Sequence, residues 1–236
     1  MALPKLNVPK YKLKLPSDGR SVNFRPFLVK EEKILLLATE TGEQDQIVAA
    51  IKDIIKECTD ITDVDKLATF DIEYLFLQIR TKSVGESVDV SITCPDDDET
   101  EVPVKIPLDE IKVVKTRGHK KDIKLSDEVA ITMGYPSLET FVQMNFGDDT
   151  NQVDQVFDMA ASCVETISDT NQVYDCSSIP KKEVVEFFEQ LSSKQFMMIQ
   201  DFFEKMPKLT HKVKVTNPNT GVESEVVLEG LASFFA

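Results

Sequence analysis

Two segments of the chain carry the same order of structural signals, and this repetition constrains the fold most. Residues 70–111 contain a helical apolar stripe, a short link, an alternating strand, a turn and a return strand, and residues 193–235 repeat that order. The turn signatures align as Ile92-Thr93-Cys94-Pro95 and Val215-Thr216-Asn217-Pro218. The repeat indicates either duplication of a helix–hairpin unit or chance, because a helix followed by a hairpin is common. Each hairpin then offers a strand edge to a neighbour or packs on its own domain.

The rest of the chain reads as one more hairpin and several amphipathic helices. Residues 6–15 and 21–25 alternate apolar and polar around Pro16-Ser17-Asp18-Gly19, which predicts an N-terminal β-hairpin. Pro103 and Pro107 predict an edge strand, because proline cannot donate to a ladder. Residues 111–124 are basic and predict a loop or a further hairpin. Apolar spacings of three and four predict helices over residues 29–40, 46–58, 71–82 and 152–167, after Ser137, after Pro180, and from a cap at Ser192 or Ser193 to residue 205.

From these elements we predict an α+β fold, with a mainly helical body, peripheral antiparallel β-hairpins and a possible internal helix–hairpin duplication. The expected domains are an N-terminal hairpin at 1–28, a helical unit with a hairpin at 29–124, and a helical unit with the C-terminal hairpin at 125–236.

The charge balance and the cysteines exclude several classes of function. The 236 residues carry a net charge of −14, which argues against nucleic acid as a partner, because phosphate binding needs clustered Lys and Arg. The chain lacks an apolar run of bilayer length, so we expect no membrane. We expect a chain without an export signal, whose four cysteines are reduced and cytosolic. The sequence contains no cluster of Cys and His residues of the kind that predicts a metal site.

Signals for catalysis are weak. The chain has 8 glycines and lacks a phosphate-binding glycine motif and a Gly-x-Ser-x-Gly elbow. His119 and His211 have no nucleophile nearby in sequence, so we read both as solvated. The acidic run 96–99 and the pair Asp148-Asp149 lack the order of a calcium loop and read as solvated turns. We therefore expect no enzyme, no cofactor and no small-molecule substrate.

Four aromatic residues are candidate contacts with other proteins: Phe24, Phe27, Phe234 and Phe235. Two aromatics at the end of a chain are exposed unless something covers them, so Phe234 and Phe235 predict docking, either within the chain or onto a partner. Deleting residues 231–236 should weaken assembly or solubility more than stability. A truncated protein that assembles normally would contradict this expectation.

A family resemblance rests on three stretches. Residues 24–36 read Phe-Arg-Pro-Phe-Leu-Val-Lys-Glu-Glu-Lys-Ile-Leu-Leu and follow the first hairpin, and residues 71–80 read Asp-Ile-Glu-Tyr-Leu-Phe-Leu-Gln-Ile-Arg. Lys-Gln-Phe at 194–196 precedes Phe-Phe-Glu-Lys-Met-Pro at 202–207. The chain thereby resembles, over nearly its whole length, the baseplate hub subunits and hub assembly proteins of T-even-like contractile-tailed bacteriophages.

The resemblance implies a role in a virus particle without catalytic residues. It implies a structural subunit of the baseplate hub of a contractile tail, whose partners are other phage baseplate hub and tail proteins. The implied location is the virion baseplate, after assembly in the bacterial host cytoplasm. The alternative is a chaperone-like factor that promotes hub assembly and does not remain in the virion.

Overall fold

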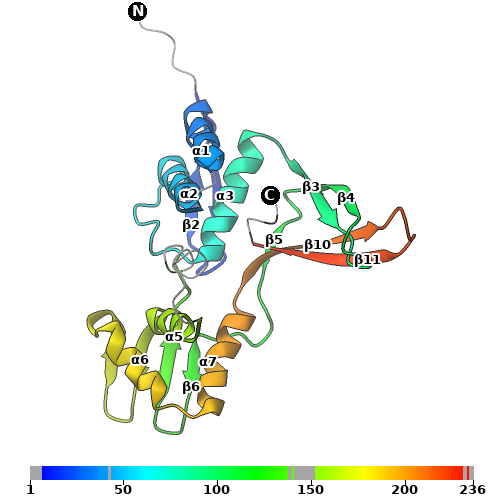
Figure 1. The fold of residues 1–236 in the computed structure, drawn as a ribbon. Helices are drawn as coiled ribbons and strands as arrows, with labels where there is room; N and C mark the ends of the chain where they lie inside the picture. Colours follow the sequence, from blue (N-terminus) through cyan, green and yellow to red (C-terminus); the bar gives the residue numbers. More distant parts are fainter. Residues whose placement is uncertain (1–6, 42–43, 138–139, 141–151, 231–232, 234–236) are drawn as a thin grey trace, which may run out of the picture. The chain divides into compact units, whose positions relative to one another are not determined.

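The computed structural model describes residues 7–41, 44–137, 140, 152–230 and 233. The chain divides into two compact units. Unit 1 combines Met1–Val114 with Lys208–Ala236, and unit 2 is the continuous segment Lys115–Pro207 (Figure 1). The chain therefore leaves unit 1 once and returns to it.

The first part of unit 1 is a hairpin with three helices. Its elements are β1 (Tyr11–Lys14), β2 (Ser21–Phe24), α1 (Val29–Thr41), α2 (Gln44–Cys58) and α3 (Thr69–Ser83). The apolar stripe of α2 is buried, with Ile54 and Ile55 fully covered. Helix α3 buries residues on several sides, including Leu75, Leu77 and Ile79, so it is the central helix of this unit.

The second part of unit 1 consists of two hairpins whose apolar faces share one core. Strands β3 (Ser87–Thr93) and β4 (Glu101–Pro107) form the first hairpin. Strands β10 (Lys208–Thr216) and β11 (Glu223–Glu229) form the second, and β5 (Lys112–Val114) adds to it in the order β11-β10-β5. Alternate residues such as Val90, Ile92, Val213 and Val215 meet in the core beneath Leu77 of α3.

In the described part of unit 2, three helices pack against an antiparallel sheet (Figure 1). The sheet has the order β6-β7-β8-β9. The strands are β6 (Asp122–Lys124), β7 (Ala130–Met133), β8 (Val164–Ser168) and β9 (Val173–Asp175), and the helices are α5 (Gln152–Ser162), α6 (Lys181–Glu189) and α7 (Ser193–Lys205), with a 3₁₀ turn at Cys176–Ser178. Ser192 and Gln195 form a capping box at the start of α7. Ile131, Phe188 and Phe202 belong to the core.

The expectation of a mainly helical body is wrong. The described part of the chain contains six helices, with 36% of residues in helix, 29% in strand and four small sheets. The difference lies mostly in unit 2, where the helix expected over residues 152–167 ends at Ser162 and strand β8 begins at Val164. The β-branched residues of β8 pair with β7, and tertiary packing of this kind decides between helix and strand. The helix expected after Ser137 falls mostly outside the described residues.

Candidate interaction surfaces

The tips of the two hairpins in unit 1 are joined by side-chain hydrogen bonds. Asn217 is fully buried, and its Nδ2 donates to Asp96 Oδ1 at 3.0 Å and to Asp97 Oδ2 at 2.8 Å. Thr220 Oγ1 donates to Asp96 Oδ2 at 2.5 Å, and Asn219 Nδ2 donates to Thr100 Oγ1 at 3.0 Å. The bonds from Thr220 and Asn217 lower the pKa of Asp96. The pKa of Asp97 is lowered first by bonds from Thr100 of its own hairpin and then by the bond from Asn217. The second hairpin is thus fixed to the first at the tip as well as through the core.

The two tips also share part of their backbone geometry, although the first turn is one residue longer than the second. Cys94 N donates to Thr100 O at 2.7 Å and Cys94 O accepts from Asp98 N at 3.0 Å. At the second tip Asn217 N donates to Val222 O at 2.9 Å and Asn217 O accepts from Gly221 N at 2.8 Å. Asp98 (φ +54°) and Gly221 (φ +76°) both occupy the left-handed region. Residues Cys94 and Asn217, which the sequence comparison aligned, therefore hold equivalent positions.

The outer edge of β4 can form only some of the backbone hydrogen bonds that a further strand would need. Leu108 N donates to Glu86 O at one end of the β3–β4 pair, and Cys94 N donates to Thr100 O at the other. Because antiparallel pairs alternate between bonded and non-bonded positions, the odd-numbered residues of β4 direct their backbone groups away from β3. Two of these outward positions are Pro103 and Pro107, which have no N–H to donate.

The outer edge of β11 differs at the equivalent positions. Gly230 N donates to Leu209 O and Asn217 N donates to Val222 O, so even-numbered residues of β11 bond to β10. The outward N–H groups belong to the odd-numbered residues Glu223, Glu225, Val227 and Glu229. None of them is proline, and among the described residues no strand pairs with this edge. The outward carbonyl of Glu229 already accepts from Ser233 Oγ at 2.7 Å. The edge of β11 is therefore open as a template for another strand along residues 223–227.

Charge on β11 is largely matched within its own hairpin. Lys212 Nζ lies 2.7 Å from Glu225, and Lys208 Nζ lies 3.3 Å from Glu229. Val227 stands between these pairs with 46% of its surface exposed. A strand that adds to this edge would meet one exposed apolar side chain flanked by partly neutralised carboxylates.

The aromatic residues predicted as contacts have different surroundings. Phe24 and Phe27 are both buried within the chain itself. Phe27 N donates to Ser83 Oγ at 2.9 Å, which joins the start of α1 to the end of α3. Phe234 and Phe235 lie outside the described residues, so their docking stays a prediction.

The stretch that begins at Phe24 forms a junction around a buried acid. Glu31 is 1% exposed, and its Oε1 accepts from Arg25 Nη2 at 2.8 Å while its Oε2 accepts from the Leu28 N–H at 2.8 Å. Burial alone would raise the pKa of Glu31, but the bonds from Arg25 and Leu28 lower it to about 2. Arg25 also donates to Glu57 O at 3.1 Å, at the end of α2. This stretch has a structural role.

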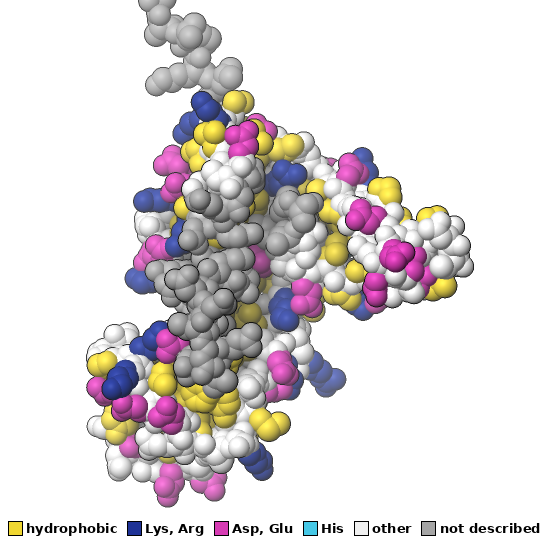
Figure 2. Space-filling model, viewed as in Figure 1, with side chains coloured by type: hydrophobic (Ala, Val, Ile, Leu, Met, Phe, Trp, Pro, Cys, Tyr) yellow, Lys and Arg dark blue, Asp and Glu magenta, His cyan; other side chains and the backbone are white. Residues whose placement is uncertain are grey.

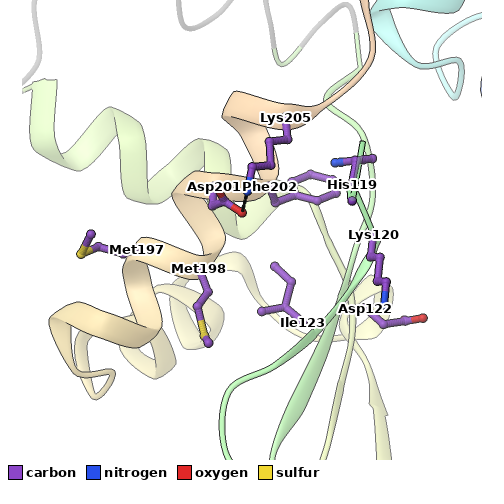
Figure 3. A pocket seen from close by; sticks show the side chains of 10 residues that line it. His119, Lys120, Asp122, Ile123, Met197, Met198, Asp201, Phe202 and Lys205 are labelled. Carbon is purple, nitrogen blue, oxygen red and sulfur yellow. Dashed lines mark hydrogen bonds and ion pairs between the residues drawn. The ribbon is translucent and has the colours of Figure 1, made fainter. Parts of the chain in front are cut away.

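His119 lies beside a cavity of about 320 Å³ in unit 2. Its Nε2 is 3.1 Å from Tyr135 Oη, and its ring lies 4.8 Å from that of Phe202. Figure 3 shows Asp201 and Lys205 of α7, which pair at 2.6 Å, along the same cavity. Burial lowers the pKa of His119. His119 is therefore partly buried and stacked, which corrects the view of it as solvated. The described lining residues include no serine, threonine or cysteine that could act as its nucleophile.

Other chemical sites are not visible in the described part of the chain. There, no group of three or more His, Cys, Asp or Glu residues is arranged to hold a metal ion. All four cysteines are free thiols. Among the described helices, none has both the length and the apolar character needed to cross a bilayer. His211 lies on β10 opposite Leu228.

Comparison with known families places the chain. The sequence model of the family described as T4 bacteriophage base plate protein matches residues 8–236. The chain belongs to this family. No curated protein and no solved structure matches it. The match confirms the resemblance inferred from the sequence, at the level of the T4 base plate family.

Membership explains the character of the surfaces described above. A baseplate protein makes contacts with other phage baseplate proteins, and the open edge of β11 is a feature suited to such contacts. Sequence reasoning found the edge strand with Pro103 and Pro107 but not the open edge. The signal available for it was the lack of proline at the equivalent positions Glu225 and Glu229.

Proposed function

We propose that this baseplate protein is a structural subunit of the baseplate hub of a contractile tail, which acts through protein–protein contacts during tail assembly. The family match over residues 8–236 carries the proposal. The hub assignment rests further on residues 24–36, which resemble hub proteins and which the structure builds into a junction of α1, α2 and β2. Its place would then be the virion baseplate, after assembly in the host cytoplasm.

The outer edge of β11 supports contact by strand addition. Main-chain hydrogen bonds supply affinity and register in such contacts, and side chains of alternate residues supply specificity. Of the two hairpins, the one that ends in β4 is blocked by proline at two outward positions, and the one that ends in β11 is not. We place a partner strand along residues 223–227 of β11 for this reason.

Replacing Val227 by proline tests this contact. The substitution removes an outward N–H and no bond of the β10–β11 ladder, so we expect the chain to fold with only a small loss of stability. Co-expression with the phage tail proteins, followed by pull-down, should recover wild-type chain with its partners and V227P without them. Val227→Thr is the matched control, because it shortens the apolar contact and keeps the N–H. Equal recovery with V227P would exclude strand addition at this edge.

Mass spectrometry of purified particles tests the hub role itself. A structural subunit should be present in mature particles, in a constant ratio to other baseplate proteins. Absence from mature particles, together with failed hub assembly when the gene is deleted, would favour the non-virion assembly factor over the structural subunit.

A further inference from the structure

Helix α1 has an exposed side that is largely apolar, on the far side from its buried residues. Glu31 and Ala38 are buried, whereas the exposed fractions are 79% for Val29, 58% for Leu36 and 52% for Leu37. Figure 2 shows hydrophobic side chains among charged ones at the position of α1. Exposed apolar residues scattered singly are ordinary, but three on one side of one helix form a surface suited to burial.

Two opposite charges lie on this same side of α1. Lys33 and Glu40 are both exposed and seven residues apart, which is close to two helical turns and brings them to one face. They are too far apart along the axis to pair with each other, because pairs within a helix form at spacings of three or four. The midpoint between Lys33 and Glu40 coincides with the midpoint between Leu36 and Leu37.

This arrangement is complementary to itself under a twofold rotation. Consider a twofold axis that passes through the midpoint of Leu36 and Leu37 and is perpendicular to the helix. This axis places Leu36 of one copy opposite Leu37 of an antiparallel second copy. It also brings Lys33 beside Glu40 of the second copy, and Glu40 beside Lys33 of the second copy. Twofold interfaces require this self-complementarity, and a parallel copy would oppose like charges instead.

We propose that α1 docks antiparallel on α1 of a second copy of this chain, with Leu36 and Leu37 at the centre and two Lys33–Glu40 pairs at the rim. The order of charges along α1 favours a second copy over an unrelated partner. A helix of 13 residues is about 20 Å long, and stable interfaces bury about 800 Å² per partner. The dimer is therefore weak and depends on concentration. The inference does not depend on the hub assignment.

Sedimentation velocity of the full chain over a range of concentrations tests the proposal. We expect a reversible monomer–dimer equilibrium for the wild type. Lys33→Glu and Glu40→Lys should each weaken dimerisation at least tenfold, because each variant opposes like charges at both rim positions. An equimolar mixture of the two variants should recover dimer, because a heterodimer of K33E with E40K restores both opposite-charge pairs.

Recovery of dimer in the mixture of K33E and E40K can come only from contact between chains, so it distinguishes docking of α1 from effects of the substitutions within one chain. Lys194→Glu, a charge reversal at an exposed position of α7, is the control and should dimerise as the wild type does. Circular dichroism melts verify that all variants fold, as expected for exposed positions. A wild type that stays monomeric at every concentration, or a K33E and E40K mixture without dimer, overturns the proposal. If α1 binds a tail protein instead, the variants will lose that protein in pull-down and their mixture will not recover it.

Discussion

At the scale of single residues, the buried acid Glu31 contributes to stability through its charge. It is the third residue of α1 and accepts the N–H of Leu28, as an acid in a capping box does. It also neutralises Arg25, whose side chain reaches the ends of β2 and α2. One carboxylate therefore connects three elements of unit 1, and its charge state decides whether that connection holds.

The depressed pKa of Glu31 predicts acid sensitivity with a defined direction. The pKa is about 2 in the folded chain against an ordinary value of 4.5. The folded state therefore favours the ionised form, and this stabilisation is fully present above pH 4.5 and lost as pH falls toward 2. The shift corresponds to about 3 kcal/mol.

Glu31→Gln mimics the protonated acid and should lower the free energy of unfolding by about 3 kcal/mol at pH 7. Urea unfolding at pH 7 and at pH 3 should show a large difference between wild type and variant at the first pH and a smaller one at the second. Glu57→Gln, at an exposed position next to the same cluster, should have little effect. An E31Q deficit that does not change with pH would contradict the assignment.

His119 predicts a second pH response, of milder kind. Burial lowers its pKa below 6.5, Asp201 opposes that shift, and Lys115 and Lys121 add to it. The neutral form is favoured by folding, so its contribution to stability is present above pH 6.5 and is lost as pH falls through the folded pKa. Between pH 7 and pH 5, the melting temperature of the wild-type protein should fall by more than that of the His119→Gln variant, as measured by thermal melts. Parallel pH profiles would refute this role.

At the scale of elements, the joined hairpin tips depend on Asn217. Replacing it by alanine removes the donor to Asp96 and Asp97 and should cost about 2 kcal/mol. Asn217→Asp should destabilise at pH 7, because a third carboxylate joins two others, and should recover as pH falls through the carboxylate range. Asn219→Ala, which removes one exposed bond to Thr100, is the control in denaturant unfolding. Equal losses for Asn217→Asp at acid and neutral pH would argue against charge repulsion.

Elements with a strong local signal were predictable from sequence, and elements formed by tertiary pairing were not. The stripe of Ile47, Ile51 and Ile54 predicts α2, and the alternating residues beside Pro95 and Pro218 predict both hairpins. The four-residue strand β7 was missed because four alternating positions carry little information. The hydrogen bonds between the hairpin tips could not be predicted from the sequence either, since they join residues more than 100 positions apart.

At the scale of the whole molecule, the path of the chain has a consequence for its synthesis. Strand β10 lies between β11 and β5, and its apolar side covers Ile92 and Leu77. During translation the first hairpin, β3–β4, is therefore synthesised long before strand β10, which covers it. Unit 2 is one continuous segment, so it is complete before β10 is made. Until Glu229 has left the exit tunnel, the apolar side of the first hairpin lacks the cover that β10 supplies, and transiently exposed apolar surface of this kind favours aggregation.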